Sequence, residues 1–200
     1  MSNKKEKEIF ITGFGGQGIV LTGNIIGKAA TLFDKKHATM TQSYGPEARG
    51  GACSSQVVIS DKEILFPYAE NPQIMICMSQ DGFNKNKQGL IKGGLLIWDT
   101  DLVQVNGLDE SWILYNIPAT RFAEELGNKM MANIVMLGFI SAVGDTASVD
   151  SLREAVLVSV PPKTRDKNSG AFDRGREYGL EILKSHAMQD KKADRKRDKH

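Results

Sequence analysis

The residues best placed to do chemistry form a short glycine loop near the start of the chain. Gly13, Gly15 and Gly18 stand at the glycine positions of a G-x-G-x-x-G pattern, and Gly16 and Gln17 lie between the last two. Glycines permit a tight turn and let backbone N–H groups approach an anion, and a helix N-terminus after the loop adds a partial positive charge. The pattern therefore favours a phosphate or diphosphate site, with a turn that serves packing alone as the alternative.

Two familiar nucleotide sites do not fit the surrounding sequence. A dinucleotide fold needs an acidic residue at the end of its second strand, about 20 residues after the loop. Here that strand is expected to end near Gln42, and Asp34 lies in the loop before it. A P-loop also fails, because residues 23–29 have one residue too few between their glycines and alanine at the position of the magnesium-binding hydroxyl. Both observations argue against NAD, FAD and a P-loop nucleotide.

A second glycine-rich loop, residues 43–51, carries side chains that could recognise an anion or a partner. Tyr44, Glu47 and Arg49 stand among its glycines, next to the expected C-terminal edge of a sheet, where α/β proteins bind ligands. Arg49 could hold a phosphate or carboxylate through two hydrogen bonds. Alternatively, Glu47 and Arg49 form an exposed ion pair in a surface turn, which contributes little to stability. The composition of the loop leaves both interpretations open.

Other reactive residue types are expected to be structural. Cys53 and Cys77 form no C-x-x-C pair, so no iron–sulfur or zinc motif is expected, and Cys53 is expected to be a small buried thiol. Asn128, Lys129 and Asn133 are expected to cap a helix, with ligand contact as the alternative. The sequence indicates no catalytic residue and no metal site in this chain.

The loops lie between short strands and longer helices. Short β-branched or aromatic runs predict strands at 8–12, 37–42, 54–60, 63–66, 73–78, 93–99 and 112–117. A turn at Asp61 and Lys62 is expected to join 54–60 and 63–66 as a hairpin. Helical spacing predicts helices at 17–33, 80–90, 118–127, 130–143, after Ser148 or Asp150, and 171–187. The alternation predicts an α/β fold with a modified doubly wound, mostly parallel sheet, helices on both faces and a local antiparallel hairpin.

Length and charge limit the class of protein. The chain has 200 residues, 40% of them apolar, which suits one domain. Residues 190–200 hold six Lys/Arg and three Asp, whereas the whole chain has a net charge of +2. The basic charge therefore lies in the end of the chain, and no basic face of a nucleic-acid binder is expected. We expect one domain at residues 1–188 and a charged, disordered tail at 189–200.

Apolar segments give the expected location. No run of about 20 apolar residues occurs, so no membrane span is expected. The first residues pass from charge directly into a short apolar run, without the long apolar stretch of a signal peptide. A cytoplasmic protein is expected.

Together, the two glycine loops resemble those of one family. The segments FITGFGGQGIVLTGNIIGKAA, TQSYGPEARGGACSSQVVIS and ILFPYAENPQIMICMS resemble the γ subunit, or γ domain, of 2-oxoacid:ferredoxin oxidoreductases. The segment NKMMANIVMLGFI extends the resemblance, which covers residues 8–185. The paired motifs GGQG and YGPEARGG are far more specific than a dinucleotide pattern alone. The chain is most similar to the 2-oxoglutarate type, and branched-chain 2-oxoacid enzymes are close.

The resemblance implies a subunit that is inactive alone. The whole enzyme would oxidatively decarboxylate a 2-oxoacid to its acyl-CoA and reduce ferredoxin. Thiamine diphosphate, magnesium and iron–sulfur clusters would lie on α, β or ferredoxin-like δ subunits. This chain would help to bind CoA, with phosphate contacts from Gly13, Gly15, Gly16, Gln17, Gly18 and Arg49. The loop that carries Arg49 could instead face the α or β subunit. The alternatives for the whole chain are a scaffold subunit and a stand-alone nucleotide-binding dehydrogenase.

Overall fold

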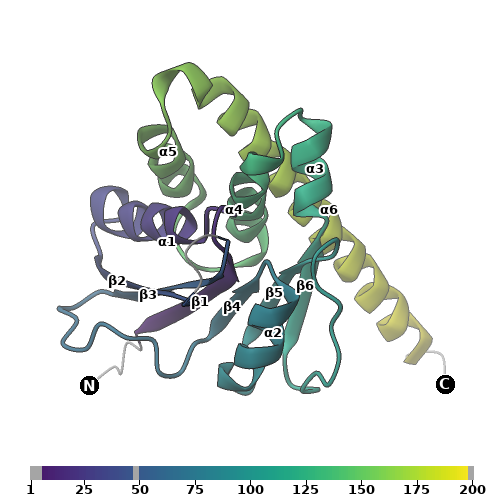
Figure 1. The fold of residues 1–200 in the computed structure, drawn as a ribbon. Helices are drawn as coiled ribbons and strands as arrows, with labels where there is room; N and C mark the ends of the chain where they lie inside the picture. Colours follow the sequence, from purple (N-terminus) through teal and green to yellow (C-terminus); the bar gives the residue numbers. More distant parts are fainter. Residues whose placement is uncertain (1–5, 47–49, 198–200) are drawn as a thin grey trace.

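The computed structural model describes residues 6–46 and 50–197, with side chains through Met188. Its centre is a six-stranded sheet in the order β2-β3-β1-β4-β5-β6 (Figure 1). The strands are β1 Lys7–Phe14, β2 His37–Tyr44, β3 Ala52–Ser60, β4 Ile74–Cys77, β5 Leu95–Asp99 and β6 Ile113–Ile117. The sequence IMIC of β4 is buried along its whole length. Such a continuous apolar run is what a strand covered on both faces requires.

The sheet is mostly parallel, as expected. Strands β1, β4, β5 and β6 run in the same direction, whereas β3 is antiparallel to both β1 and β2. Thr12 on β1 lies opposite Ser54 on β3 and Cys77 on β4. The predicted α/β class, with an antiparallel hairpin in a mostly parallel sheet, is confirmed, but the hairpin is β2–β3.

The predicted hairpin between 54–60 and 63–66 is wrong. Strand β3 is hydrogen-bonded to β1 on one side and to β2 on the other, so it has no free edge for residues 63–66. Those residues lie in an irregular segment that continues past β2, where Thr39 Oγ1 donates to the carbonyl of Pro67 at 3.4 Å. Pro67 also has no N–H group for a ladder. The short apolar run EILF has the composition of a strand but no strand to pair with.

Helices cover both faces of the sheet. They are α1 Ile19–Lys28, continued by the π-helical turn η1 Ala29–Phe33, then α2 Gln80–Asn86, α3 Ala119–Glu125, α4 Ala132–Val143, α5 Val149–Ser159 and α6 Arg165–Arg197. Short 3-10 turns are η2 Lys87–Gly89, η3 Lys129–Met131 and η4 Pro162–Thr164. The larger core cluster joins one face of the sheet to α1, α3, α4, α5 and α6, and a smaller one joins the other face to α2 through Phe83. Among the described helices, none is both long and apolar enough to cross a membrane.

Helix α4 is the central helix of the larger core. Ten of its residues, from Ala132 to Ser141, are buried. It lies directly against α6, because a Cβ atom at Gly138 would lie 1.9 Å from the carbonyl oxygen of Phe172. A Cβ atom at Gly175 of α6 would likewise lie 1.9 Å from the carbonyl oxygen of Val135. Glycine on both helices therefore lets the two backbones touch.

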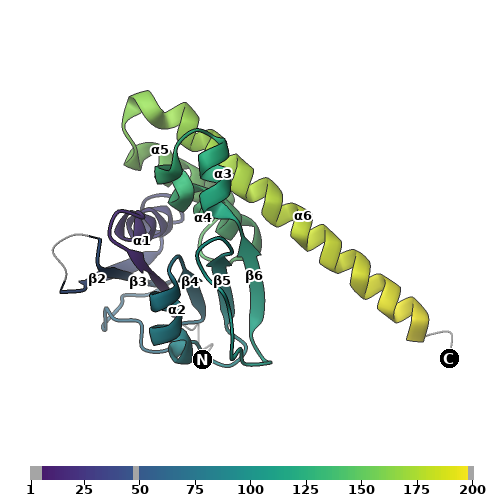
Figure 2. The same ribbon diagram turned by 45° about the vertical axis from the view of Figure 1, so that its right-hand side comes forward.

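Helix α6 is longer than the sequence predicts. It begins at Arg165, ahead of the predicted start at 171, and its backbone is helical to Arg197. No glycine or proline follows Gly179, and the Lys, Arg, Ala, Gln and Asp residues of the last turns include many good helix formers. The helix projects from the body of the molecule (Figure 2). The division into a domain at 1–188 and a disordered tail at 189–200 stays a prediction.

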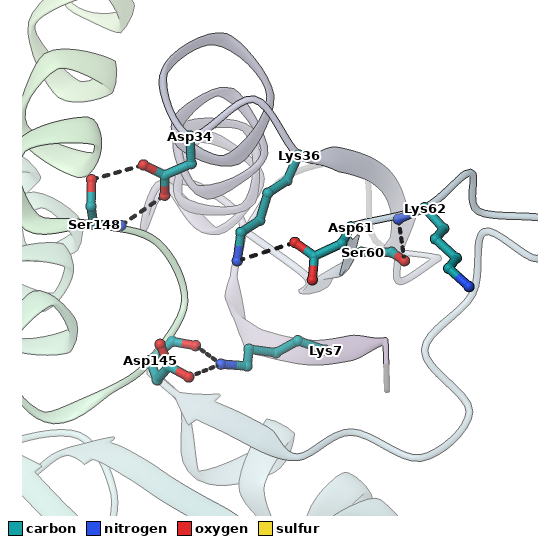
Figure 3. Close-up of polar contacts among 8 residues, drawn as sticks. All are labelled: Lys7, Asp34, Lys36, Ser60, Asp61, Lys62, Asp145 and Ser148. Atoms are coloured by element: carbon teal, nitrogen blue, oxygen red, sulfur yellow. Dashed lines mark hydrogen bonds and ion pairs between the residues drawn. The ribbon is translucent and has the colours of Figure 1, made fainter. Parts of the chain in front are cut away.

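Polar contacts hold the segment between α4 and α5 against the sheet (Figure 3). Asp34 accepts hydrogen bonds from the backbone nitrogen and the hydroxyl of Ser148, both at 2.8 Å, and from the hydroxyl of Ser151. Lys7 on β1 contacts Asp145. Partial burial raises the pKa of Asp34, but the hydrogen bonds from Ser151 and Ser148 outweigh it and hold that pKa below its ordinary value. Asp34 therefore anchors the start of α5.

Candidate functional site

The candidate site lies where the four parallel strands end. The glycine loop follows β1, Met78 and Ser79 follow β4, Asp99 ends β5, and Thr120 lies two residues after Pro118 at the end of β6. Parallel strands bring their carboxyl ends to one edge, which is the usual ligand edge of an α/β sheet. Segments that are far apart in the sequence therefore meet around the glycine loop.

The glycine loop is closed by its own glutamine. The side-chain oxygen of Gln17 accepts a hydrogen bond from Phe14 N at 2.6 Å, and Gln17 N donates to Phe14 O at 3.2 Å. A Cβ atom at Gly13 would lie 2.5 Å from that same side-chain oxygen. Gln17 therefore fixes the shape of the loop, which the sequence alone did not indicate.

Two glycines of the loop adopt left-handed backbone conformations. Gly16 has φ +93° and faces open space, and Gly18 has φ +74° and precedes the first turn of α1. Side chains other than glycine rarely adopt this region, so the loop requires glycine at both positions. The result is a short, open backbone turn directly before a helix N-terminus, which is the geometry that binds anions.

The two glycine-rich loops are in direct contact. Gly15 N donates a hydrogen bond to Gly51 O at 2.8 Å, and a Cβ atom at Gly15 would lie 3.3 Å from Gly50 N. At the other side of the second loop, Gly45 N donates to Ala52 O at 2.6 Å. The structure thus brings together the two motifs that the sequence analysis singled out. Arg49, the sixth predicted CoA contact, lies outside the described residues.

Asp99 holds the neighbouring strand end in place. Its buried carboxylate accepts hydrogen bonds from Thr120 N at 2.8 Å, Thr120 Oγ1 at 2.7 Å and Asp101 N at 2.9 Å. Burial raises the pKa of Asp99 above its ordinary value, although these donors favour the charged form. Because its oxygens face internal donors, Asp99 positions the start of α3 and with it Thr120.

Two hollows flank the end of β1. The first has a volume of about 100 Å³ and is lined by Gly16, Gln17, Met78, Thr120, Lys129, Met130 and Ala132. The second, of about 170 Å³, lies between the β2–β3 loop and α2, and its lining includes Ser43, Tyr44, Asp81 and Lys85. The first hollow is mainly apolar and contacts the glycine loop itself. Met78, Thr120 and Met130 carried no signal in the sequence, because their role comes only from the strand order.

The other candidates divide into capping and buried residues. Asn128 caps η3 by accepting from Met130 N at 3.1 Å, as expected. Asn133 makes no such cap and lies inside the first turn of α4. Cys53 is buried, as expected, and burial raises the pKa of both cysteine thiols, that of Cys77 to about 12. In the described part of the chain, no three His, Cys, Asp or Glu side chains gather as metal ligands.

Comparisons with known proteins identify the family. Residues 8–178 match the family model of pyruvate ferredoxin/flavodoxin oxidoreductase. The chain is 48% identical to the 2-oxoglutarate synthase subunit KorC of Methanocaldococcus jannaschii, over 90% of this chain and 97% of that relative. The predicted resemblance is therefore confirmed, including its 2-oxoglutarate type.

Solved structures agree with this family. A keto/oxoacid ferredoxin oxidoreductase γ subunit from Geobacter sulfurreducens is 35% identical, with a TM-score of 0.75 over 87% of this chain and 98% of that one. The fold also matches 2-oxoglutarate:ferredoxin oxidoreductase from Magnetococcus marinus, solved with 2-oxoglutarate, coenzyme A and succinyl-CoA, at TM-score 0.79 and 22% identity. That match covers 88% of this chain but only 31% of the Magnetococcus marinus chain, which is much longer. The chain belongs to the pyruvate ferredoxin/flavodoxin oxidoreductase family.

Proposed function

We propose that this chain is the γ-type subunit of a 2-oxoglutarate:ferredoxin oxidoreductase and that it contributes phosphate contacts to CoA. The observation that carries the CoA role is the glycine loop, in which Gly16 and Gly18 hold an open left-handed turn before α1. The identity to KorC over almost the whole of both chains supports the substrate. The bound coenzyme A of the Magnetococcus marinus enzyme supports the co-substrate.

The remaining chemistry belongs to partner chains in this proposal. We assign thiamine diphosphate, magnesium and iron–sulfur clusters to α, β or ferredoxin-like δ subunits, and ferredoxin is the acceptor of the complex. The match to less than a third of a longer oxidoreductase chain supports a domain that works within a larger assembly. We place the complex in the cytoplasm.

A stand-alone dehydrogenase has less support. The second strand, β2, ends at Tyr44, and the acidic residue that would hold a ribose is missing from that strand. Asp34, the nearest acid before β2, is engaged by Ser148 and Ser151 instead. The isolated chain is therefore expected to show no NAD(P)H-linked turnover.

The first test is purification of this chain with its native partners, followed by an assay with a low-potential dye. We expect thiamine- and cluster-binding chains to co-purify, and dye reduction to require both 2-oxoglutarate and CoA. A chain that purifies alone, without CoA-dependent activity, would contradict the proposal. CoA-dependent activity on another 2-oxoacid would correct the substrate and leave the CoA role intact.

A matched pair of glycine variants tests the loop. Gly16 and Gly93 both have positive φ, +93° and +73°, and both face open space, but Gly93 lies in the turn before β5, at the opposite edge of the sheet. Gly16→Asp is expected to raise the KM for CoA about tenfold or more, since a carboxylate there repels phosphate, and tenfold corresponds to about 1.4 kcal/mol. Gly93→Asp carries similar backbone strain and should leave that KM unchanged. Equal effects of the two variants would rule out a phosphate site at the loop.

A further inference from the structure

Two helix N-termini meet at the glycine loop. Helix α1 begins directly after Gly18, and the first turn of α4 lies against the same residue, because a Cβ atom at Gly18 would be 2.4 Å from Asn133 Nδ2. Each helix N-terminus carries a partial positive charge. Asn128 already accepts hydrogen bonds from Met130 N and Met131 N. These two N–H groups are therefore not free to bind a ligand, and α4 can contribute only its helix dipole and the side chains of its first residues.

Asn133 holds a donor without a partner. Its side chain is 2% exposed, and Nδ2 has no hydrogen-bond partner among the described residues. A buried unpaired donor costs about 1–3 kcal/mol, which an arriving acceptor would recover. The nitrogen lies directly against Gly18, in the turn that precedes α1. An oxygen of a ligand on the loop is the acceptor that this position fits.

Lys129 places a full positive charge near the N-terminus of α4, where a cation is unfavourable. It lies in η3, just before α4, where the helix dipole disfavours a cation. Its ion pair with Glu124, at 3.5 Å, is exposed on both sides and contributes little. An anion beside the glycine loop would offset this unfavourable charge. Lys129 also lines the same hollow as Gly16.

The hollow itself accepts an apolar group. Its volume is about 100 Å³, and Met78, Met130 and Ala132 supply apolar walls next to Gly16 and Lys129. The Met130 side chain is 65% exposed, so it is available to a ligand. Because Gly16 belongs to both the loop and the lining of the hollow, one ligand could place a phosphate at the loop and an attached apolar group in the hollow. A branched aliphatic chain that ends in a phosphate has this combination of groups.

We infer that Asn133 and Lys129, with the N-termini of α1 and α4, form a subsite for the phosphate that carries the pantetheine arm of CoA, and that the hollow takes the start of that arm. This inference rests on the proposed function. It assigns one end of the co-substrate to these residues, and the adenosine 3′-phosphate lies elsewhere.

The test measures the dissociation constants of three ligands on the complex purified through this chain: CoA, 4′-phosphopantetheine and adenosine 3′,5′-bisphosphate. The variants are Lys129→Glu and Asn133→Asp, with Lys163→Glu as the matched control. Lys163 is an exposed lysine in η4, the 3-10 turn before α6, just as Lys129 is in the turn before α4. Lys129 and Lys163 are exposed, and an acidic residue near a helix N-terminus favours the helix, so the two lysine variants should retain the fold. Asn133 is buried, so folding of Asn133→Asp is checked by its Tm before its ligands are measured.

Lys129→Glu and Asn133→Asp are expected to raise the dissociation constants of CoA and 4′-phosphopantetheine about tenfold or more, because each places a negative charge beside the phosphate. The dissociation constant of adenosine 3′,5′-bisphosphate should change by less than about twofold in both variants. In the control Lys163→Glu, the dissociation constants of all three ligands should change by less than about twofold. Unchanged CoA binding in both site variants would overturn the inference and leave the proposed function standing. An equal loss of all three ligands would overturn the assignment to the pantetheine end. A wild-type complex that binds no CoA would refute the proposed function itself.

Discussion

Replacing Gly175 by alanine should separate α4 from α6, and the size of the effect follows from their contact. The new Cβ atom would lie 1.9 Å from Val135 O, 2.8 Å from Val135 C and 2.9 Å from Phe139 N. All three are backbone atoms of α4, so rotation of a side chain cannot relieve the contact. Overpacking costs about 1–3 kcal/mol, and this site belongs at the upper end, while the helix propensity of alanine returns about 1 kcal/mol. A net loss of about 2 kcal/mol is expected.

Gly170, one and a half turns earlier in the same helix, is the matched control. A Cβ atom there would meet nothing within 4 Å. Gly170→Ala should therefore stabilise the chain by about 0.5–1 kcal/mol through helix propensity alone. For a domain of this size, 1 kcal/mol corresponds to about 2–4 °C in Tm, so the two alanines should shift Tm in opposite directions, by about 4–8 °C down and about 1–4 °C up.

Thermal unfolding of the purified chain, followed by circular dichroism, gives both values. A Tm for Gly175→Ala at or above that of the wild type would refute the backbone contact between α4 and α6. The contact matters for the site, because α4 carries Asn133 and follows directly on η3, which carries Lys129 and Met130. A displaced α4 should therefore weaken CoA binding as well as stability.

Two further predictions concern the rest of the fold. Asp34→Ala should lower the free energy of unfolding by about 1 kcal/mol at neutral pH, because Ser148 and Ser151 lose the carboxylate that accepts their hydrogen bonds. Because the folded pKa of Asp34 lies below its model-compound value of 3.8, this difference should persist above that pH and vanish as the pH falls through the folded pKa, as acid titrations of both proteins would measure. Removal of residues 189–200 should change the free energy of unfolding by less than about 0.5 kcal/mol, since it leaves the ring contact of Tyr115 with His186 at 5.7 Å intact. Removal of residues 185–200 deletes that contact and should lower the free energy of unfolding by about 0.5–1.5 kcal/mol more. Urea unfolding measures both truncations, and an equal loss of stability in the two would place the domain boundary elsewhere.

The sequence predicted local structure well where composition and neighbours agree. The run EIFIT before the glycines is part of β1, and the apolar segment after Gly18 is α1 with its π-helical continuation. Both elements have an unambiguous pattern, because β-branched residues favour the strand and a long apolar run with few polar breaks favours a buried helix. The strand–turn–helix geometry of the loop follows from these two elements together.

The order of the strands and the long-range contacts could not be predicted from local sequence patterns. The run EILF at 63–66 has the composition of a strand, yet β3 pairs with β2 and β1 and leaves it no partner. Met78 and Thr120 reach the site only because β4, β5 and β6 follow β1 in the sheet. Asn133 was expected to cap a helix, since its type favours caps, but tertiary packing against Gly18 places it inside α4.

The position of β3 explains why a dinucleotide-like loop need not bind a dinucleotide. In that fold the second strand lies beside the first, so its acidic end reaches the ribose. Here β3 lies between β1 and β2, which moves the end of β2 about 10 Å from the loop, twice the strand spacing. The place beside Gly15 is taken by Gly51, whose carbonyl accepts the Gly15 N–H. The proposed phosphate contacts do not depend on the ribose contact that is lost, so we expect the loop to bind a co-substrate through its phosphates.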